Sequence, residues 1–235
     1  MQNRSSVGFE RTLTRAIEVL DGDGAVVVAN PSPMTYGVVA RDAHAVNLLK
    51  QRPVDQAVAI SVHSAPTRQQ VFRVLDVQDN KIAVIDFALG ERISVLAPIR
   101  TGVAVPEWLS PAAQDGWLAF FDGSWAPLAS LWHRFPFLYG SSANQTGEAP
   151  AASASEARRQ FTADTVVVDA DHLRTPDAEH GASTMIRVNP AGHLSLHRSG
   201  IQDRAAGGPK TLLDRLNETR ASSTFTCRPG GQGRA

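Results

Sequence analysis

The sequence predicts a mixed α/β fold in which helices flank one twisted sheet. Short continuous apolar runs, such as 25–29, are typical of strands that are buried on both faces. Apolar side chains at helical spacing over 9–20 predict an amphipathic helix, and clusters of Gly, Pro and Asn separate such segments. A chain of 235 residues is long enough to bury one large core and to carry a tail.

The first quarter of the chain is expected to alternate helices and strands. In order, we expect a helix at 9–20, strands at 25–29 and 38–40, a helix at 42–49 and a strand at 58–62. Asp42 lies where a side-chain oxygen can cap the second helix. The turn-rich loop 30–37 joins two strands, and such loops are where α/β proteins usually bind ligands.

The rest of the chain favours strands. We expect strands at 71–75 and 81–85 around a turn at Asp79-Asn80, then at 93–96, 117–121 and 165–169, and a hairpin of 183–188 with 193–198. A short helix is expected at 126–134. Another begins at Ser153, where Ser-x-x-Glu has the form of a capping box.

The composition changes after Gly200, and we therefore place the domain at 1–200 and a tail at 201–235. The tail is rich in Arg, Ser and Gly, so we expect it to be mobile apart from a short helix at 211–218. Its Cys227 is the one cysteine of the chain, which excludes a disulfide framework and a cysteine metal cluster.

Composition restricts the function further. Hydrophobic residues make up 43% and charged residues 20%, as in globular proteins. The 23 basic and 23 acidic side chains cancel, so any anion site must be local, and unspecific nucleic-acid binding has no electrostatic support. We expect a cytoplasmic protein with no membrane partner, because neither a signal peptide nor a membrane-spanning run is visible.

Hydroxyl, amide and cationic side chains gather at predicted strand or helix ends. The four clusters are Ser32 with Thr35, Lys50 with Arg52, the stretch from Ser141 to Thr146, and Ser183-Thr184 followed by Arg198. Such donors, without paired carboxylates or a set of metal ligands, favour a phosphate-bearing ligand, and a helix starting at Ser153 would add free N–H groups. Taken singly, the hydroxyls are ordinary turn and cap residues, and the two cations suit the end of any helix.

Five motifs in the same order resemble the YrdC-type domain of the threonylcarbamoyl-AMP synthases. Lys50-Gln51-Arg52-Pro53 is similar to the KxRP motif of that family, and 141–147 is similar to TSANxSG. Pro31 to Gly37 falls where the family has PT(D/E)xxYG, Ala182-Ser183-Thr184 resembles PST, and 196–200 resembles LxRxG. The resemblance covers roughly residues 10 to 200. It implies a YrdC-like twisted mixed sheet flanked by helices, with a central anion-binding cleft.

The resemblance also implies a function. Members of the family use ATP, Mg²⁺ and bicarbonate, form a carbamoyl adenylate on L-threonine and release pyrophosphate for tRNA modification. By the matching motifs, Lys50 and Arg52 would be catalytic. Ser142, Asn144, Ser153 and Arg198 would bind the nucleotide, and no protein side chain is expected to bind a metal. We call the amine that receives the carboxyl group the acceptor, which is L-threonine in the family. The side of the cleft that binds the acceptor would be formed by Ser32, Ser61, Phe121, Ser141 and Ser183.

Several departures from the family pattern fall on the acceptor side. Pro33 stands at the acidic position of PT(D/E), and Ser61 aligns with the histidine that contacts threonine in the family. The WPGPxT segment is replaced by 88–91. The arginine that pairs with the threonine carboxylate falls at Phe121, and no Arg or Lys lies between Arg100 and Arg134.

These departures predict an acceptor other than threonine. Removing the cation from a buried charge pair costs on the order of 2–5 kcal/mol, which is roughly 30-fold to several-thousand-fold in affinity. Five aromatic side chains either line a more apolar acceptor pocket or belong to the core: Trp117, Phe120, Phe121, Trp125 and Trp132.

Three functions remain open at this point. The chain is an active synthase of this type, acting on threonine or another small amine or amino acid and working with partners in tRNA modification or elsewhere. Alternatively, it is a nucleotide- or RNA-binding module that has lost synthesis, or a structural protein without a ligand. Retention of Lys50, Arg52, Asn144 and Arg198 favours the first two.

Overall fold

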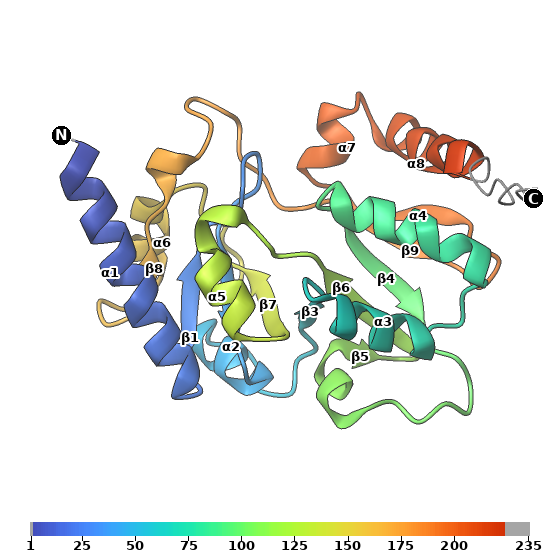
Figure 1. Cartoon of the computed structure of the whole chain (residues 1–235), viewed down its shortest axis with the longest axis horizontal. Coiled ribbons are helices and arrows are strands. Elements are labelled where there is room, and N and C mark those ends of the chain that lie inside the picture. The colour runs from blue at the N-terminus through green and yellow to red at the C-terminus, as the bar shows by residue number, and fades with distance from the viewer. Residues whose placement is uncertain (1, 224–235) are drawn as a thin grey trace, which may run out of the picture.

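One mixed sheet runs through the protein, with helices packed on it (Figure 1). The computed structural model describes residues 2–223. The strands are β1 (Ala25–Val28), β2 (Gly37–Ala40), β3 (Ala59–Ser61), β4 (Ser94–Pro98), β5 (Ala113–Gln114), β6 (Trp117–Phe121), β7 (Leu138–Ser142), β8 (Val167–Val168), β9 (Met185–Val188) and β10 (Leu194–Arg198).

The helices are α1 (Gln2–Asp21), α2 (Ala43–Leu49), α3 (Ala65–Val74), α4 (Asp79–Gly90), α5 (Ala129–Arg134), α6 (Ala154–Gln160), α7 (Ile201–Ala205) and α8 (Pro209–Ser223). Three short 3₁₀ helices lie at Glu107–Ala112, Ala126–Leu128 and Asp171–Leu173. Within the described part of the chain, no helix combines the length and the apolar composition needed to cross a membrane.

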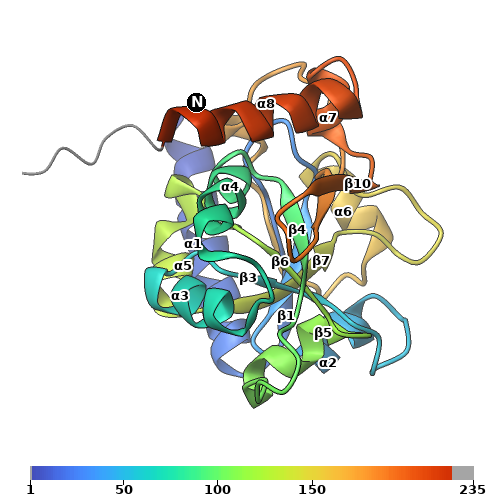
Figure 2. The same cartoon turned by 90° about the vertical axis from the view of Figure 1, so that its right-hand side faces the viewer.

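The strand order is β10-β9-β4-β6-β3-β7-β2-β1-β8, with β5 paired to β6. Neighbours pair in parallel at β3–β6, β4–β9 and β1–β8 and antiparallel elsewhere. In Figure 2 the helices α1, α3, α4 and α5 lie together on one side of this sheet. The predicted mixed sheet flanked by helices is therefore confirmed.

Several of the predicted elements form where the sequence pattern places them. Val26 and Val27 of β1 are fully buried, as expected for a strand covered on both faces. Asp42 caps α2 by accepting a bond from the N–H of His44 at 3.1 Å. The hairpin of β9 and β10 forms around the predicted turn, and Ala129–Arg134 forms the predicted helix after its 3₁₀ start.

The strands predicted at 71–75 and 81–85 are wrong, because both segments are helical. Ser64 caps α3 by accepting from the N–H of Thr67, and Pro66 lies in the first turn, where its missing N–H costs nothing. The supposed turn at Asp79 is the first turn of α4. The buried side chains of α4 follow helical spacing: Lys81, Val84, Ile85, Ala88 and Leu89.

The chain after Gly200 differs in part from the prediction. The short helix expected at 211–218 is present within the longer α8, but α7 and the rest of α8 form where a mobile tail was expected. Leu212 and Leu216 of α8 are fully buried, and α8 packs against α4 and β10. The polar composition of this segment led us to expect a tail, although these two leucines form an apolar face that packs on the domain. Cys227 lies outside the described residues.

A buried carboxylate joins α7 to the start of β9 and the end of β10. One oxygen of Asp203 accepts bonds from the hydroxyl of Thr184 and the N–H of Gly200, each at 2.6 Å, and the other accepts from Ser199 at 2.7 Å. Burial by itself raises the pKa of Asp203, but these hydrogen bonds outweigh it and hold that pKa below its ordinary value. The network therefore fixes the chain next to Arg198.

Asp203→Ala is expected to lower the free energy of unfolding by about 2–4 kcal/mol, because it leaves buried donors without an acceptor. Asp214→Ala on α8 serves as the matched control. Its pair with Lys210 is exposed to solvent and contributes little to stability. Urea denaturation at pH 7 measures both changes.

The pH dependence gives a second test of the same network. Because its folded pKa is lowered, Asp203 contributes stability above the unfolded pKa, and that contribution disappears as the pH falls through the folded value. The stability difference between wild type and Asp203→Ala should therefore shrink below about pH 4. A difference that is constant from pH 7 to pH 3 would contradict the network.

Candidate functional site

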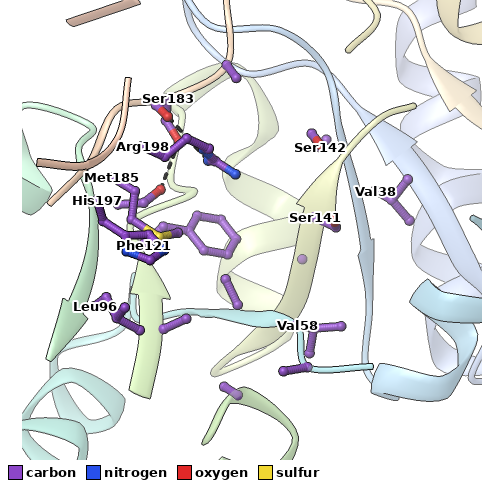
Figure 3. A pocket seen from close by; sticks show the side chains of 18 of the residues that line it. Val38, Val58, Leu96, Phe121, Ser141, Ser142, Ser183, Met185, His197 and Arg198 are labelled. Atoms are coloured by element: carbon purple, nitrogen blue, oxygen red, sulfur yellow. Dashed lines mark hydrogen bonds between the residues drawn. The ribbon is translucent and has the colours of Figure 1, made fainter. Parts of the chain in front are cut away.

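A pocket of about 540 Å³ lies on one face of the sheet and is lined by residues from β2, β4, β6, β7, β9 and β10. This volume lies in the range that accommodates small molecules and cofactors. Figure 3 shows Phe121 projecting into the middle of it. Arg198 and Ser183 lie on one side of Phe121, and Ser141, Ser142 and Val38 lie on the other.

The register of the strands explains which side chains share the pocket. Ser94 pairs with Met185, which in turn pairs with Arg198, so the three lie in one row across β4, β9 and β10. Leu96 pairs with both Ala119 and Arg187, which makes a second row on the same face. Side chains two residues apart point to the same face of a strand, so both rows open into the pocket.

Arg52 reaches the pocket because α2 ends just before it. Gln51 adopts a left-handed conformation with φ of 50°, which turns the chain out of the helix. The Nε–H of Arg52 donates to Asn47 Oδ1 at 2.6 Å, while its Nη2 is buried without a hydrogen-bond partner in the described part of the protein. Such an orphan donor favours an anionic ligand beside it.

Lys50 is buried and does not line the pocket. Its ammonium donates to the carbonyls of Ser142 and Asn144 and, at 3.1 Å, to the side-chain oxygen of Asn144. These bonds use all three donors of the group. Burial, followed by the nearby Arg52 charge, lowers the pKa of Lys50 to about 8.

The loop after β7 meets the pocket through its hydroxyls. Ser141 and Ser142 both line the pocket, and the Ser142 hydroxyl also donates to Asn144 Oδ1 at 2.6 Å. The amide nitrogen of Asn144 donates to the carbonyls of Gln145 and Glu148. Asn144 therefore shapes the loop and, in this structure, does not line the pocket.

Arg198 and Ser183 approach the pocket from β10 and from the segment before β9. The Nη2 of Arg198 donates to the Ser183 carbonyl at 3.3 Å, and the Ser183 hydroxyl bonds with that of Ser94 at 2.8 Å. Gly200 allows the close approach of these segments, because a Cβ there would lie 2.2 Å from the N of Thr184.

Three predicted site residues have other roles in the structure. Ser32 bonds with His180 at 3.1 Å and accepts from the N–H of Thr175. Ser61 is fully buried, bonds with His63 and accepts from the N–H of Gly123. The third residue is Ser153, described below. Ser32, Ser61 and Ser153 do not line the pocket.

Ser153 caps α6 by accepting from the N–H of Glu156 at 3.2 Å. The N–H of Ala154 is not free for a ligand, since it donates to Asp171 at 2.9 Å. The expectation that this helix end offers free N–H groups to a phosphate is therefore wrong for Ala154 and Glu156. A carboxylate of the protein already takes the favourable anion position there.

The five aromatic residues divide between pocket and core. Trp117 and Phe121 line the pocket, as the acceptor hypothesis expected. Phe120 and Trp132 are buried, and Trp125 packs against the core. Within β6 the alternation of side chains explains the division. Trp117 and Phe121 are odd-numbered and face the pocket, whereas the even-numbered Phe120 faces the core.

Two arginines of the pocket were missed by sequence reasoning. Arg92 follows α4 and lies just before β4, and Arg187 extends from β9 over the Trp117 ring, 4.0 Å from its centroid. The segment before Arg92 was predicted as a strand, so its position beside the pocket could not be deduced. The alternation along β9, with Ile186 and Val188 buried, was the available signal for Arg187.

No group of three or more His, Cys, Asp or Glu side chains that could hold a metal ion is found among residues 2–223. Asp122, one of the two acidic residues that line the pocket, pairs with Arg68 at 2.8 Å and with Arg92 at 3.4 Å. We therefore assign no protein side chain to Mg²⁺.

No protein-family model matches the sequence, and no curated protein matches it. Solved structures do match. P. abyssi Sua5 in complex with L-threonine aligns with a TM-score of 0.55 and 18% identity, over 82% of this chain and 54% of that one. E. coli YciO aligns with a TM-score of 0.58 and 12% identity, over 81% and 90%.

Full-length HypF in its phosphate- and nucleotide-bound form aligns with a TM-score of 0.54 and 14% identity, over 81% of this chain and 29% of HypF. This chain spans just over half the length of the Sua5 structures. Identities this low carry the fold alone. The fold predicted from the motifs is confirmed: the chain forms a YrdC-like domain, divergent in sequence from the solved structures that share it.

Proposed function

We propose that the pocket binds ATP and that the protein forms a carbamoyl adenylate on a small amine or amino acid, with release of pyrophosphate. One observation carries this proposal: Arg52 and Arg198, which come from motifs far apart in the sequence, line one pocket together with the hydroxyls of Ser141, Ser142 and Ser183. The shared fold with HypF, whose structure holds phosphate and nucleotide, supports it.

The charge of the pocket suits a polyphosphate. Arg52, Arg187 and Arg198 line it, whereas Arg92, which also lines it, is paired with Asp122. Asp115 and Asp122 are the carboxylates among the lining residues, and Asp122 is paired with Arg68 as well. Guanidinium groups grip phosphate oxygens in pairs of parallel hydrogen bonds, so the other three arginines attract a triphosphate.

The proposed reaction needs no covalent enzyme intermediate. The amine attacks the carbon of bicarbonate and loses water to give a carbamate. A carbamate oxygen then attacks the α-phosphorus of ATP, the bond to the β-phosphate breaks, and pyrophosphate leaves. Arg52 and Arg198 would position the phosphates and neutralise their growing charge, which is how preorganised cations accelerate such transfers. Mg²⁺ would enter bound to the triphosphate oxygens and would neutralise part of their charge.

Lys50 has a different role in this proposal from the one that the motif implied. Its three bonds hold the loop of Ser142 and Asn144, so we assign it as a positioning residue for the nucleotide-binding hydroxyls. Ser32, Ser61 and Ser153 likewise support the pocket from outside it. The cytoplasmic location and a link to tRNA modification belong to the same proposal.

Arg52→Gln and Arg198→Gln are each expected to weaken ATP binding roughly 10-fold or more, since each removes a charge-assisted bond. Calorimetric titration with MgATP measures binding, and pyrophosphate release in the presence of bicarbonate and an amine panel measures turnover. Arg134→Gln is the matched control, because Arg134 pairs with Asp21 on the surface, away from the pocket. Wild-type affinity in both pocket variants would refute the site. Binding without turnover for every acceptor would favour a nucleotide-binding module that has lost synthesis.

Lys50→Met tests the burial of the Lys50 ammonium, on which its positioning role depends, through pH. Because the pKa of Lys50 is lowered to about 8 in the folded protein, the unfolded chain holds the proton more tightly between pH 8 and its ordinary value near 10.5. Wild type should therefore gain about 2 kcal/mol of stability relative to Lys50→Met between pH 7.5 and pH 10. Urea denaturation at both pH values measures this. Parallel pH profiles of the two proteins would show that Lys50 is not buried as described.

A further inference from the structure

We propose that Arg92 binds the carboxylate of the acceptor, and that the acceptor is an α-amino acid with an apolar side chain larger than that of threonine. This inference rests on the proposed function, because that reaction requires an amine. It identifies which amine the pocket selects.

The unused donors of Arg92 carry the first step. Its hydrogen bonds all come from Nη1, which lies 3.4 Å from both Asp122 Oδ1 and the Asp122 carbonyl and 3.3 Å from Ser124 Oγ. Within residues 2–223, no partner is found for its Nε or Nη2. These two groups form the edge of a guanidinium that grips a carboxylate with two parallel bonds.

The charges around Arg92 balance, but one edge of its guanidinium stays open. Arg68 lies between Asp86, at 2.7 Å, and Asp122, at 2.8 Å, and Asp122 also pairs with Nη1 of Arg92 at 3.4 Å. Two arginines and two carboxylates thus form a neutral cluster. A ligand carboxylate brings a single negative charge to this cluster and is repelled by its carboxylates less than a polyphosphate is.

The end of α4 fixes the position of Arg92. Arg92 adopts a left-handed conformation with φ of 61°, and the N–H groups of Arg92 and Ile93 donate to the carbonyls of Leu89 and Ala88, which is a usual way for a helix to end. The carbonyl of Arg92 accepts from Gln202 of α7 at 3.0 Å, which holds the turn. The backbone therefore keeps this side chain at the pocket.

The apolar part of the same region defines the acceptor side chain. Phe121 stands in the middle of the pocket, with Met185 close by and the Ser94 hydroxyl in the same row as Met185 (Figure 3). The Phe121 ring offers the hydroxyl of a side chain such as that of threonine no strong hydrogen-bond partner. An apolar side chain instead gains about 25 cal/mol for each Å² that it buries there.

Pairs of ligands that differ only in the carboxylate test the assignment. L-leucine is compared with isopentylamine and L-phenylalanine with phenethylamine, beside L-threonine, by calorimetry on the full chain with and without a non-hydrolysable ATP analogue. We expect one of the two apolar amino acids to bind more tightly than threonine. Its amine should bind about 30-fold or more weakly than the acid.

Arg92→Gln should remove the preference for the acid while leaving the affinity for the ATP analogue at the wild-type value. Arg92→Lys, which keeps the charge but lacks the fork, should retain part of the preference, and Arg134→Gln should retain all of it. If Arg92→Gln does not fold, the ligand pairs on wild type still decide.

Equal binding of acid and amine, tightest binding of threonine, or an equal loss of ATP affinity in Arg92→Gln would overturn the inference. Failure of the ATP analogue to bind, with Arg92-dependent binding of an amino acid, would instead overturn the proposed function and leave the carboxylate site standing.

Discussion

The buried ammonium of Lys50 is the interaction on which the arrangement of the pocket depends. A charge taken out of water is costly unless its hydrogen bonds are replaced, and here three oxygens of Ser142 and Asn144 replace them. These bonds join the end of α2 to the loop after β7. The left-handed Gln51 then turns Arg52 toward the pocket, while Ser142 faces it from the other side. The short segment from Lys50 to Arg52 thereby positions Arg52 on one side of the pocket and Ser142 on the other.

Sequence patterns predicted most of the sheet but not the helices between β3 and β4. The strands succeed because burial on both faces demands continuous apolar runs, which are distinctive. The segments 71–75 and 81–85 misled because a five-residue window of β-branched and apolar side chains fits either period. Only the longer spacing of Lys81, Val84 and Leu89 reveals the helix. Of the C-terminal helices, α7 was missed and α8 was expected only as a short helix at 211–218, because Leu212 and Leu216 gain their stability from α4 and β10, not from their own segment.

The candidate site was predictable only where the chemistry follows the motifs. Arg52, Ser141, Ser142, Ser183 and Arg198 come from separate motifs and line one pocket, and their roles in binding stay predictions. Lys50, Asn144 and Ser153 instead make hydrogen bonds within the chain around the pocket. Arg92 could not be placed, because its position depends on a helix that was assigned as a strand and on a turn fixed by Gln202. A motif specifies residue types at intervals, but tertiary packing decides which side chain faces the ligand.

The most direct test of this account is a crystal structure of the protein with Mg²⁺ and a non-hydrolysable ATP analogue. The account predicts the triphosphate between Arg52 and Arg198, the Ser142 hydroxyl within hydrogen-bond distance of it, and the Nε and Nη2 of Arg92 still free. A nucleotide bound outside this pocket, or phosphates seated on Arg92 and not on Arg52, would contradict it.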